Sequence, residues 1–229
     1  YKKHKKECLR LVKERKKKIS EPIKETEDVE DCPICCDALP NISAQFVRLT
    51  CCGKGLHKKC DKDLVENKSM TLEQKNTCIM CRAKLVKNGS KEDIERLRNW
   101  VKKGKAWAMS LLAGIYIDGV GVKQSDTKAI ELLEMAAKRG NAAAQFNLGD
   151  YYRQGSLGLT QSSEKAVKYY TFAAKQEHAG AQTSLGNMYY FGKGVETCYA
   201  KAREWWTKAA AQGDEYAIKS LTQLDELGL

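Results

Sequence analysis

Cysteine and histidine residues crowd one short part of this sequence, at spacings that suit a metal ion. Eight of the ten cysteines lie within residues 32–81. Three pairs in this stretch are separated by two residues, a gap that lets a tight turn direct both side chains at one zinc ion. These pairs are Cys32 with Cys35, His57 with Cys60, and Cys78 with Cys81.

Three pairs provide six ligands, whereas two tetrahedral zinc ions need about eight. Cys51 and Cys52 complete that count. A disulfide between these neighbours would form a strained ring. Cys36 could replace Cys35, but that would break the two-residue gap. The residues therefore predict two zinc sites, and spacing alone allows either sequential or interleaved pairing of the four ligand pairs.

The chemistry expected of these zinc ions is structural. All four positions of each site are filled by protein, which leaves no place for a reactive water. The stretch has few large apolar residues, so metal binding should supply much of its folding free energy. The sequence contains no Ser-His-Asp set, phosphate-binding loop or nucleophile motif, and we expect no catalytic residue.

The ligand order C-x2-C, x15, C-C, x4, H-x2-C, x17, C-x2-C resembles a RING finger, in its variant with cysteines at the third and fourth positions. The resemblance covers residues 31–84 and implies a cross-brace, in which the two zinc sites interleave. Site one would contain Cys32, Cys35, His57 and Cys60; site two would contain Cys51, Cys52, Cys78 and Cys81.

This resemblance also implies a function, ubiquitin transfer by docking. A RING finger binds a ubiquitin-charged conjugating enzyme and holds the thioester in a reactive pose, so catalysis is by positioning. Ile34 matches the apolar contact to the conjugating enzyme, and Arg82 matches the basic residue that holds ubiquitin against it. Ile79 stands where many active members have proline, and no Trp occurs between Cys60 and Cys78. A non-enzymatic scaffold is therefore the alternative.

From residue 105 the chain repeats itself. AMSLLAGIYIDGVGV from Ala108 aligns with AQFNLGDYYRQGSLGL from Ala144 and AQTSLGNMYYFGKGV from Ala181, at offsets of 36 and 37 residues. Each stretch is followed by an alanine-rich helical pattern, so each unit predicts a helix hairpin. Helices at 91–104 and at the C-terminus extend the pattern as half repeats, which makes eight helices.

This pattern resembles the Sel1-like repeats, relatives of the tetratricopeptide repeats, over residues 91–229. The third repeat carries most of the motif, including Leu185, Gly186, Tyr189 and the Trp205–Trp206 pair. The first repeat departs from it at Ala113, where the motif has Gly. The resemblance implies a scaffold for protein partners, here the protein substrate. We interpret the Tyr and Trp positions as core.

Two charge blocks precede the cysteines. Residues 1–19 contain ten Lys or Arg against two Glu, and residues 20–31 contain six acids against one Lys. The first block favours a solvated helix, with a nuclear import signal or a nucleic-acid contact as alternatives. The second favours a linker. Nucleic acid is not the partner that we expect.

Taken together, the sequence predicts a mainly α protein: a small zinc-bound cross-brace RING module followed by an α/α helix-hairpin solenoid. The chain has 229 residues, with no apolar run long enough to span a membrane and no secretory signal. We therefore expect a eukaryotic-type protein of the cytoplasm or nucleus, with Cys8 and Cys198 as free thiols. The expected divisions are 1–30 (basic helix and acidic linker), 31–84 (finger), 85–90 (linker) and 91–229 (repeats).

Overall fold

The computed structural model describes residues 46–48, 55–57 and 89–228. The chain divides into two compact units, Tyr1–Leu85 and Val86–Leu229. None of the helices in the described part combines the length and the apolar character that crossing a bilayer requires.

The described part of the first unit is a two-stranded antiparallel hairpin. Strand β1 (Phe46–Arg48) pairs with β2 (Gly55–His57), so that Phe46 lies opposite His57 and Arg48 opposite Gly55. In sequence, Cys51 and Cys52 fall between these two strands, and His57 ends the second.

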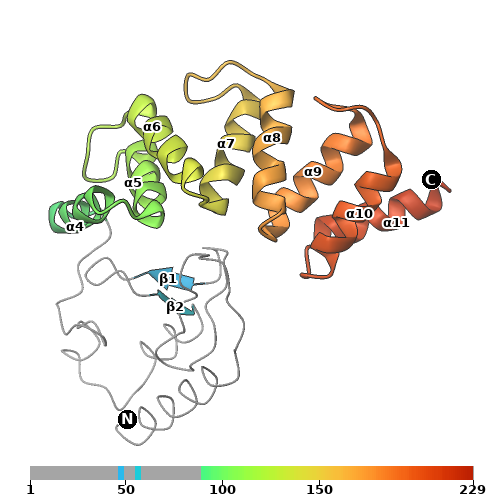
Figure 1. Cartoon of the computed structure of the whole chain (residues 1–229), viewed down its shortest axis with the longest axis horizontal. Helices are drawn as coiled ribbons and strands as arrows, with labels where there is room; N and C mark the ends of the chain where they lie inside the picture. The colour runs from blue at the N-terminus through green and yellow to red at the C-terminus, as the bar shows by residue number, and fades with distance from the viewer. Residues whose placement is uncertain (1–45, 49–54, 58–88, 229) are drawn as a thin grey trace, which may run out of the picture. The chain divides into compact units, whose positions relative to one another are not determined.

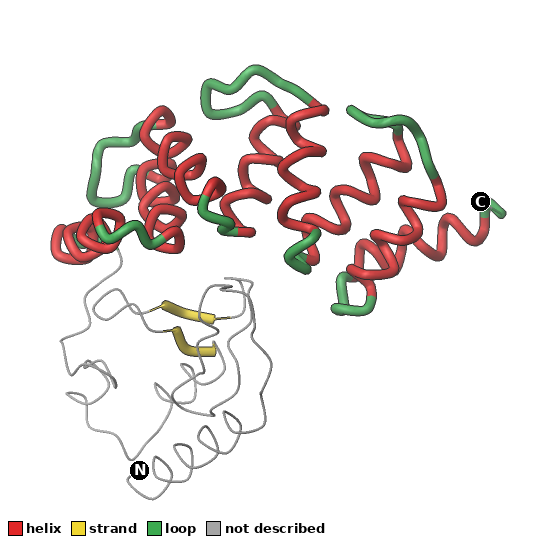
Figure 2. Tube along the Cα trace, in the orientation of Figure 1, coloured by secondary structure: helices red, strands yellow, loops and turns green. Residues whose placement is uncertain are grey.

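The described part of the second unit contains eight helices, the number predicted from the repeats. Figures 1 and 2 show them following one another as antiparallel hairpins along the array. Along the chain, each helix packs against the one before it and the one after it. The helices are α4 (Lys91–Lys102), α5 (Ala106–Asp118), α6 (Asp126–Lys138), α7 (Ala142–Gln154), α8 (Ser163–Ala174), α9 (Ala179–Phe191), α10 (Tyr199–Ala210) and α11 (Glu215–Glu226).

Helix boundaries follow from local capping chemistry. Ser90, the N-cap of α4, accepts a hydrogen bond from the backbone N–H of Asp93. Helices α5, α7 and α9 each end at a glycine in the left-handed conformation, which an L side chain adopts only at a cost. These residues are Gly119, Gly155 and Gly192, with φ of 68°, 68° and 65°.

The core of the array is built from the repeated positions. The leucines at equivalent positions of α5, α7 and α9 are buried, as are the alanine positions of α6 and α8. Helices α6, α8 and α10 each carry two adjacent large residues, of which the second is buried and the first is only partly buried. The buried members are Leu133, Tyr170 and Trp206, and the partly buried ones are Leu132, Tyr169 and Trp205.

The departure of the first repeat at Ala113 has a packing explanation. A Cβ atom added to Gly149 would lie 2.6 Å from ring carbons of Tyr170, and one added to Gly186 would lie 2.5 Å from the Trp206 ring. Glycine is therefore needed wherever an aromatic ring fills the hairpin. At the equivalent place the first repeat has Leu133, which is smaller, and there the helix carries a fully buried Ala113.

Candidate protein-binding surface

The predicted zinc ligands lie outside the described residues, apart from the backbone of His57 at the end of β2. The predicted partner contacts Ile34 and Arg82 also lie outside them. Within the described residues, no three His, Cys, Asp or Glu side chains are grouped so that they could hold a metal ion. The two zinc sites therefore stay a prediction.

The repeats carry a recurring contact where each hairpin turns. The ammonium group of a lysine near the start of the second helix lies over the ring of a tyrosine near the end of the first. Each tyrosine carbonyl also accepts a hydrogen bond from the N-cap of that second helix, at 2.8–3.0 Å. The lysine–tyrosine pairs are Lys128 with Tyr116 at 5.4 Å, Lys165 with Tyr152 at 4.8 Å, and Lys201 with Tyr189 at 5.1 Å.

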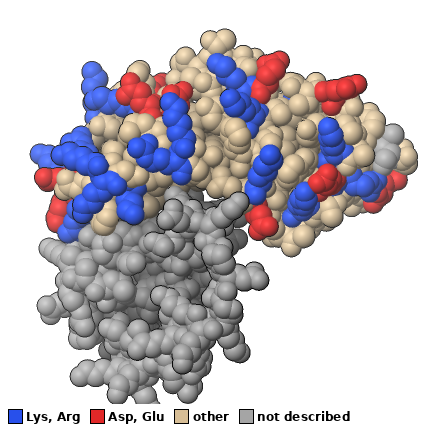
Figure 3. All heavy atoms as spheres, viewed as in Figure 1, with Lys and Arg blue, Asp and Glu red and all other residues tan. Residues whose placement is uncertain are grey.

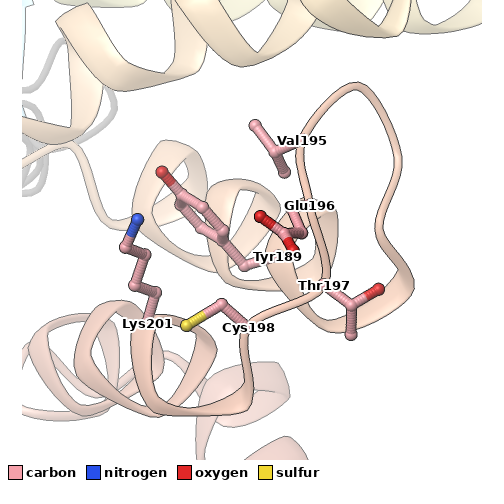
Figure 4. A pocket seen from close by; sticks show the side chains of 6 residues that line it. All are labelled: Tyr189, Val195, Glu196, Thr197, Cys198 and Lys201. Atoms are coloured by element: carbon pink, nitrogen blue, oxygen red, sulfur yellow. The ribbon is translucent and has the colours of Figure 1, made fainter.

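In the third repeat this turn forms an open pocket of about 440 Å³. Figure 4 shows the Lys201 side chain beside the Tyr189 ring, with the Cys198 thiol next to them. Cys198 is a free cysteine, as predicted. The pocket combines an amine, a phenol, a carboxylate and a thiol without an organised hydrogen-bonded set, so its geometry supports contact rather than catalysis. Its lining is Tyr189, Val195, Glu196, Thr197, Cys198 and Lys201.

A polar network orients the buried aromatic residues. The Tyr170 hydroxyl donates to Asp150 at 2.7 Å and accepts from Arg153 Nε at 3.1 Å. Burial, followed by the Asp150 carboxylate, raises the pKa of Tyr170 well above its usual value, so this phenol stays neutral. In the next repeat Trp206 Nε1 donates to Asn187 at 3.1 Å, so each hairpin supplies the acceptor that its aromatic residue needs.

Two buried glutamines, which were not predicted, join successive repeats. Gln145 donates to the Ala137 carbonyl at 3.0 Å and accepts from Gln176 at 2.6 Å. One repeat later, Gln182 accepts from Gln212 at 2.8 Å and donates to the carbonyl of Ala174 at 3.3 Å. The one feature of the sequence that could have indicated these bonds is the recurrence of glutamine at the same position of two repeats, Gln145 and Gln182.

Large apolar side chains remain exposed at equivalent positions of successive repeats. Met135 on α6 and Phe172 on α8 are 39% and 43% exposed. Phe191 on α9 and Leu227 at the end of α11 are 63% and 55% exposed. None of these four residues was predicted from the sequence to lie on a binding surface. Covering exposed apolar side chains of this size lowers the free energy, so these residues are candidate partner contacts.

Comparison with known families agrees with this architecture. The Sel1 repeat family matches residues 108–141, 142–178 and 179–214. The fold is similar to that of a Sel1 repeat protein from Oxalobacter formigenes, at 36% identity and a TM-score of 0.56 over 58% of this chain and 98% of that protein. The chain belongs to the Sel1 repeat family.

A second solved Sel1-type structure is similar over a longer stretch. It is a protective antigen present in uropathogenic Escherichia coli strains, at 27% identity and a TM-score of 0.60. The match covers 75% of this chain and 33% of the antigen, so the chain spans about a third of that protein. No curated protein matches the sequence significantly. As a Sel1 repeat protein, the chain presents a helical solenoid, an architecture that offers extended surfaces for protein partners.

Proposed function

We propose that this chain is a protein-binding scaffold whose Sel1 repeats recruit a protein partner. The observation that carries this proposal is the solenoid with its exposed apolar side chains at equivalent helix positions, Met135 with Phe172 and Phe191 with Leu227. Within the described residues the geometry offers no assembled catalytic set, so recruitment is the function that it supports best.

Affinity capture from a cell extract tests the scaffold function. The wild-type chain should retain partners that the Phe172→Asp and Phe191→Asp variants lose, because an aspartate would have to be desolvated at the interface. Lys168→Asp, an exposed position on the same helix as Phe172, is the matched control. If all four proteins captured the same partners, these apolar positions would not form the binding surface.

The finer proposal is that the scaffold is a RING-type ubiquitin ligase. In it, the zinc finger docks a ubiquitin-charged conjugating enzyme through Ile34 and Arg82, and the repeats bring the protein substrate. Its support is the eight-ligand order of the sequence: Cys32, Cys35, Cys51, Cys52, His57, Cys60, Cys78 and Cys81. Holding the thioester in a reactive pose requires no nucleophile on this chain.

Ubiquitin discharge from a panel of charged conjugating enzymes tests the ligase function. We expect faster discharge with the wild-type chain than with buffer, and a reduced rate with Arg82→Ala. Metal analysis should give two zinc ions per chain, and Cys51→Ser should lower that number and unfold the finger. Two zinc ions with no acceleration of discharge would favour the alternative, a non-enzymatic zinc-binding adaptor.

A further inference from the structure

Basic side chains gather where the repeats turn from one hairpin to the next at the α4–α6 end of the array. The turn after α4 reads Lys102-Lys103-Gly104-Lys105, and α6 ends with Lys138 before Arg139 and a glycine. Figure 3 shows Lys and Arg side chains gathered over this end of the array on the face in view. A Cβ atom added to Gly104 would lie 4.0 Å from Arg139 Nε, so the two turns are neighbours.

All five basic side chains of these turns are exposed: Lys102, Lys103, Lys105, Lys138 and Arg139. Neither turn contains an acidic residue. In the described part of the chain, the ion pairs are made by other basic residues, namely Arg96, Arg153, Arg203 and Lys208. We refer to the five exposed residues of the two turns, Lys102, Lys103, Lys105, Lys138 and Arg139, as the basic edge.

The positive charge is specific to the first two turns. The equivalent turn between α8 and α9 combines Lys175 with Glu177, and the turn between α10 and α11 has Asp214 and no basic residue. All four turns connect the same pair of helix types in the same fold. The repeat architecture therefore does not require the basic edge.

Lysine at position 105 is unfavourable for folding, which also indicates that the basic edge is kept for binding. It occupies the N-cap position of α5 and makes no side-chain capping bond. At the equivalent positions Asn141, His178 and Asp214 each accept a hydrogen bond from the backbone of the following helix. A lysine there also places positive charge at the positive end of a helix. A residue that breaks a local folding rule in this way is typical of a functional surface.

We propose that the basic edge binds an acidic polypeptide segment. This inference rests on the protein-binding part of the proposed function and is independent of ubiquitin transfer. The aromatic surroundings favour a polypeptide over a single-stranded nucleic acid, which binds through rings open to base stacking. The neighbouring rings are engaged: Trp100 packs against Trp107 at 5.8 Å and lies under the Lys103 ammonium at 4.5 Å. Carboxylates spaced along an extended segment could pair with the lysines of both turns.

Fluorescence anisotropy with the full chain tests the inference. Labelled octaglutamate is the probe for an acidic polypeptide, and a labelled twelve-nucleotide thymidine strand, measured separately, is the probe for nucleic acid. Lys138→Glu should weaken octaglutamate binding about fivefold, and Lys103→Glu combined with Lys138→Glu about twentyfold. Lys175→Glu is the matched control, because it reverses charge at the equivalent position one repeat later. It should leave the affinity for octaglutamate unchanged.

Lys105→Asn provides a second readout that does not depend on correct folding of a charge-reversed turn. Asparagine restores the cap that Asn141 provides one repeat later, so this variant should melt at a higher temperature and yet bind octaglutamate severalfold more weakly. A purely structural role for Lys105 predicts the higher melting temperature with unchanged affinity.

Two results would overturn the inference. One is equal octaglutamate affinity in the wild-type chain and in every variant of the basic edge, since binding would then come from charge elsewhere. The other is thymidine-strand binding that depends on the basic edge and weakens steeply with salt while octaglutamate does not bind, which would identify a nucleic-acid surface. In either case the capture experiment with Phe172→Asp would still report separately on the scaffold function.

Discussion

The interior of the repeats and the turns between their helices vary in different ways. In the interior, substitutions occur in compensating pairs: Gly149 lies under Tyr170, Gly186 lies under Trp206, and Ala113 accompanies the smaller Leu133. At the N-caps, single residues differ from repeat to repeat while the backbone conformation stays nearly the same, as at Lys105, Asn141 and His178. The interior is therefore coupled through packing, whereas each cap contributes locally.

The largest effect should come from breaking an interior pair. Gly186→Ala places a methyl group 2.5 Å from the Trp206 ring, which is 3% exposed and cannot move outward, so we expect a loss of about 3 kcal/mol in the free energy of unfolding. Urea denaturation measures it. The reverse change at the matched site, Ala113→Gly, should cost about 1 kcal/mol, the usual penalty of glycine in a helix.

A double variant tests whether the interior is coupled. Trp206→Leu combined with Gly186→Ala reproduces the pair found in the first repeat, so in the Trp206→Leu background Gly186→Ala should lose much of its effect. We expect a coupling energy of at least about 1 kcal/mol from the double-mutant cycle. Losses that simply add would contradict the paired description of the interior.

The next effect concerns a cap that depends on pH. His178 Nδ1 accepts from the Ala181 N–H at 3.2 Å, and burial lowers the pKa of His178 below its ordinary value. Below about pH 6.5 the unfolded chain takes up a proton that the folded His178 resists, so stability should fall as pH falls from 7.5 to 5.5. His178→Asn should keep the cap, worth about 1 kcal/mol, and remove this share of the pH dependence.

Melting temperatures at both pH values check this, and Asn141→His is the reciprocal control. It should introduce a pH dependence at the equivalent cap. If His178→Asn and the wild-type chain lost the same stability between pH 7.5 and 5.5, another group would be responsible.

A smaller effect is expected from a turn residue in a conformation suited to glycine. Glu177 has φ of 62°, whereas the equivalent positions hold Gly140 and Gly213, each with φ of 84°. Glu177→Gly should raise the free energy of unfolding by about 0.8 kcal/mol, because the left-handed conformation is unfavourable for residues with a Cβ. Glu177→Ala should give no such gain, and a gain from both variants would show that the Glu177 side chain itself destabilises the turn.

The smallest effect is at the N-cap of α10. Cys198 makes no side-chain capping bond, whereas Ser125 and Ser162 at the equivalent positions accept from the backbone of the helix that follows. Cys198→Ser should therefore stabilise the protein by about 0.5 kcal/mol. Thermal denaturation measures the gain, and Cys198→Ala, which cannot cap, should not show it.

The repeated positions made most of the helical array predictable. The aligned repeats and the alanine-rich patterns that follow them predicted eight helices, and this number is confirmed in the part of the chain that the structure describes. The reason for Ala113 could not be read from the motif, because Ala113 and Leu133 belong to different helices. The Gln145 and Gln182 bonds were missed for the same reason, since their partners lie in neighbouring repeats.

The candidate surface was less predictable than the fold. Exposure of Met135 and Phe172 depends on which side of α6 and α8 the adjacent helices cover, and their apolar character alone would place them in the core. The zinc ligands between Cys32 and Cys81 remain a prediction that is based on the spacing of Cys and His residues in the sequence. Their test is chemical, through zinc content and ubiquitin discharge.

The buried glutamines also limit how a hairpin can sit on the repeat before it. Gln145 and Gln182 each donate to a backbone carbonyl of the preceding repeat, that of Ala137 and that of Ala174. A hairpin that slid along its neighbour would leave the buried amide without this acceptor, at about 1–3 kcal/mol each. Met109 and Ile218, their counterparts towards the ends of the array, make no such demand. The two central junctions therefore fix the register of stacking through a polar contact, and the outer ones do not.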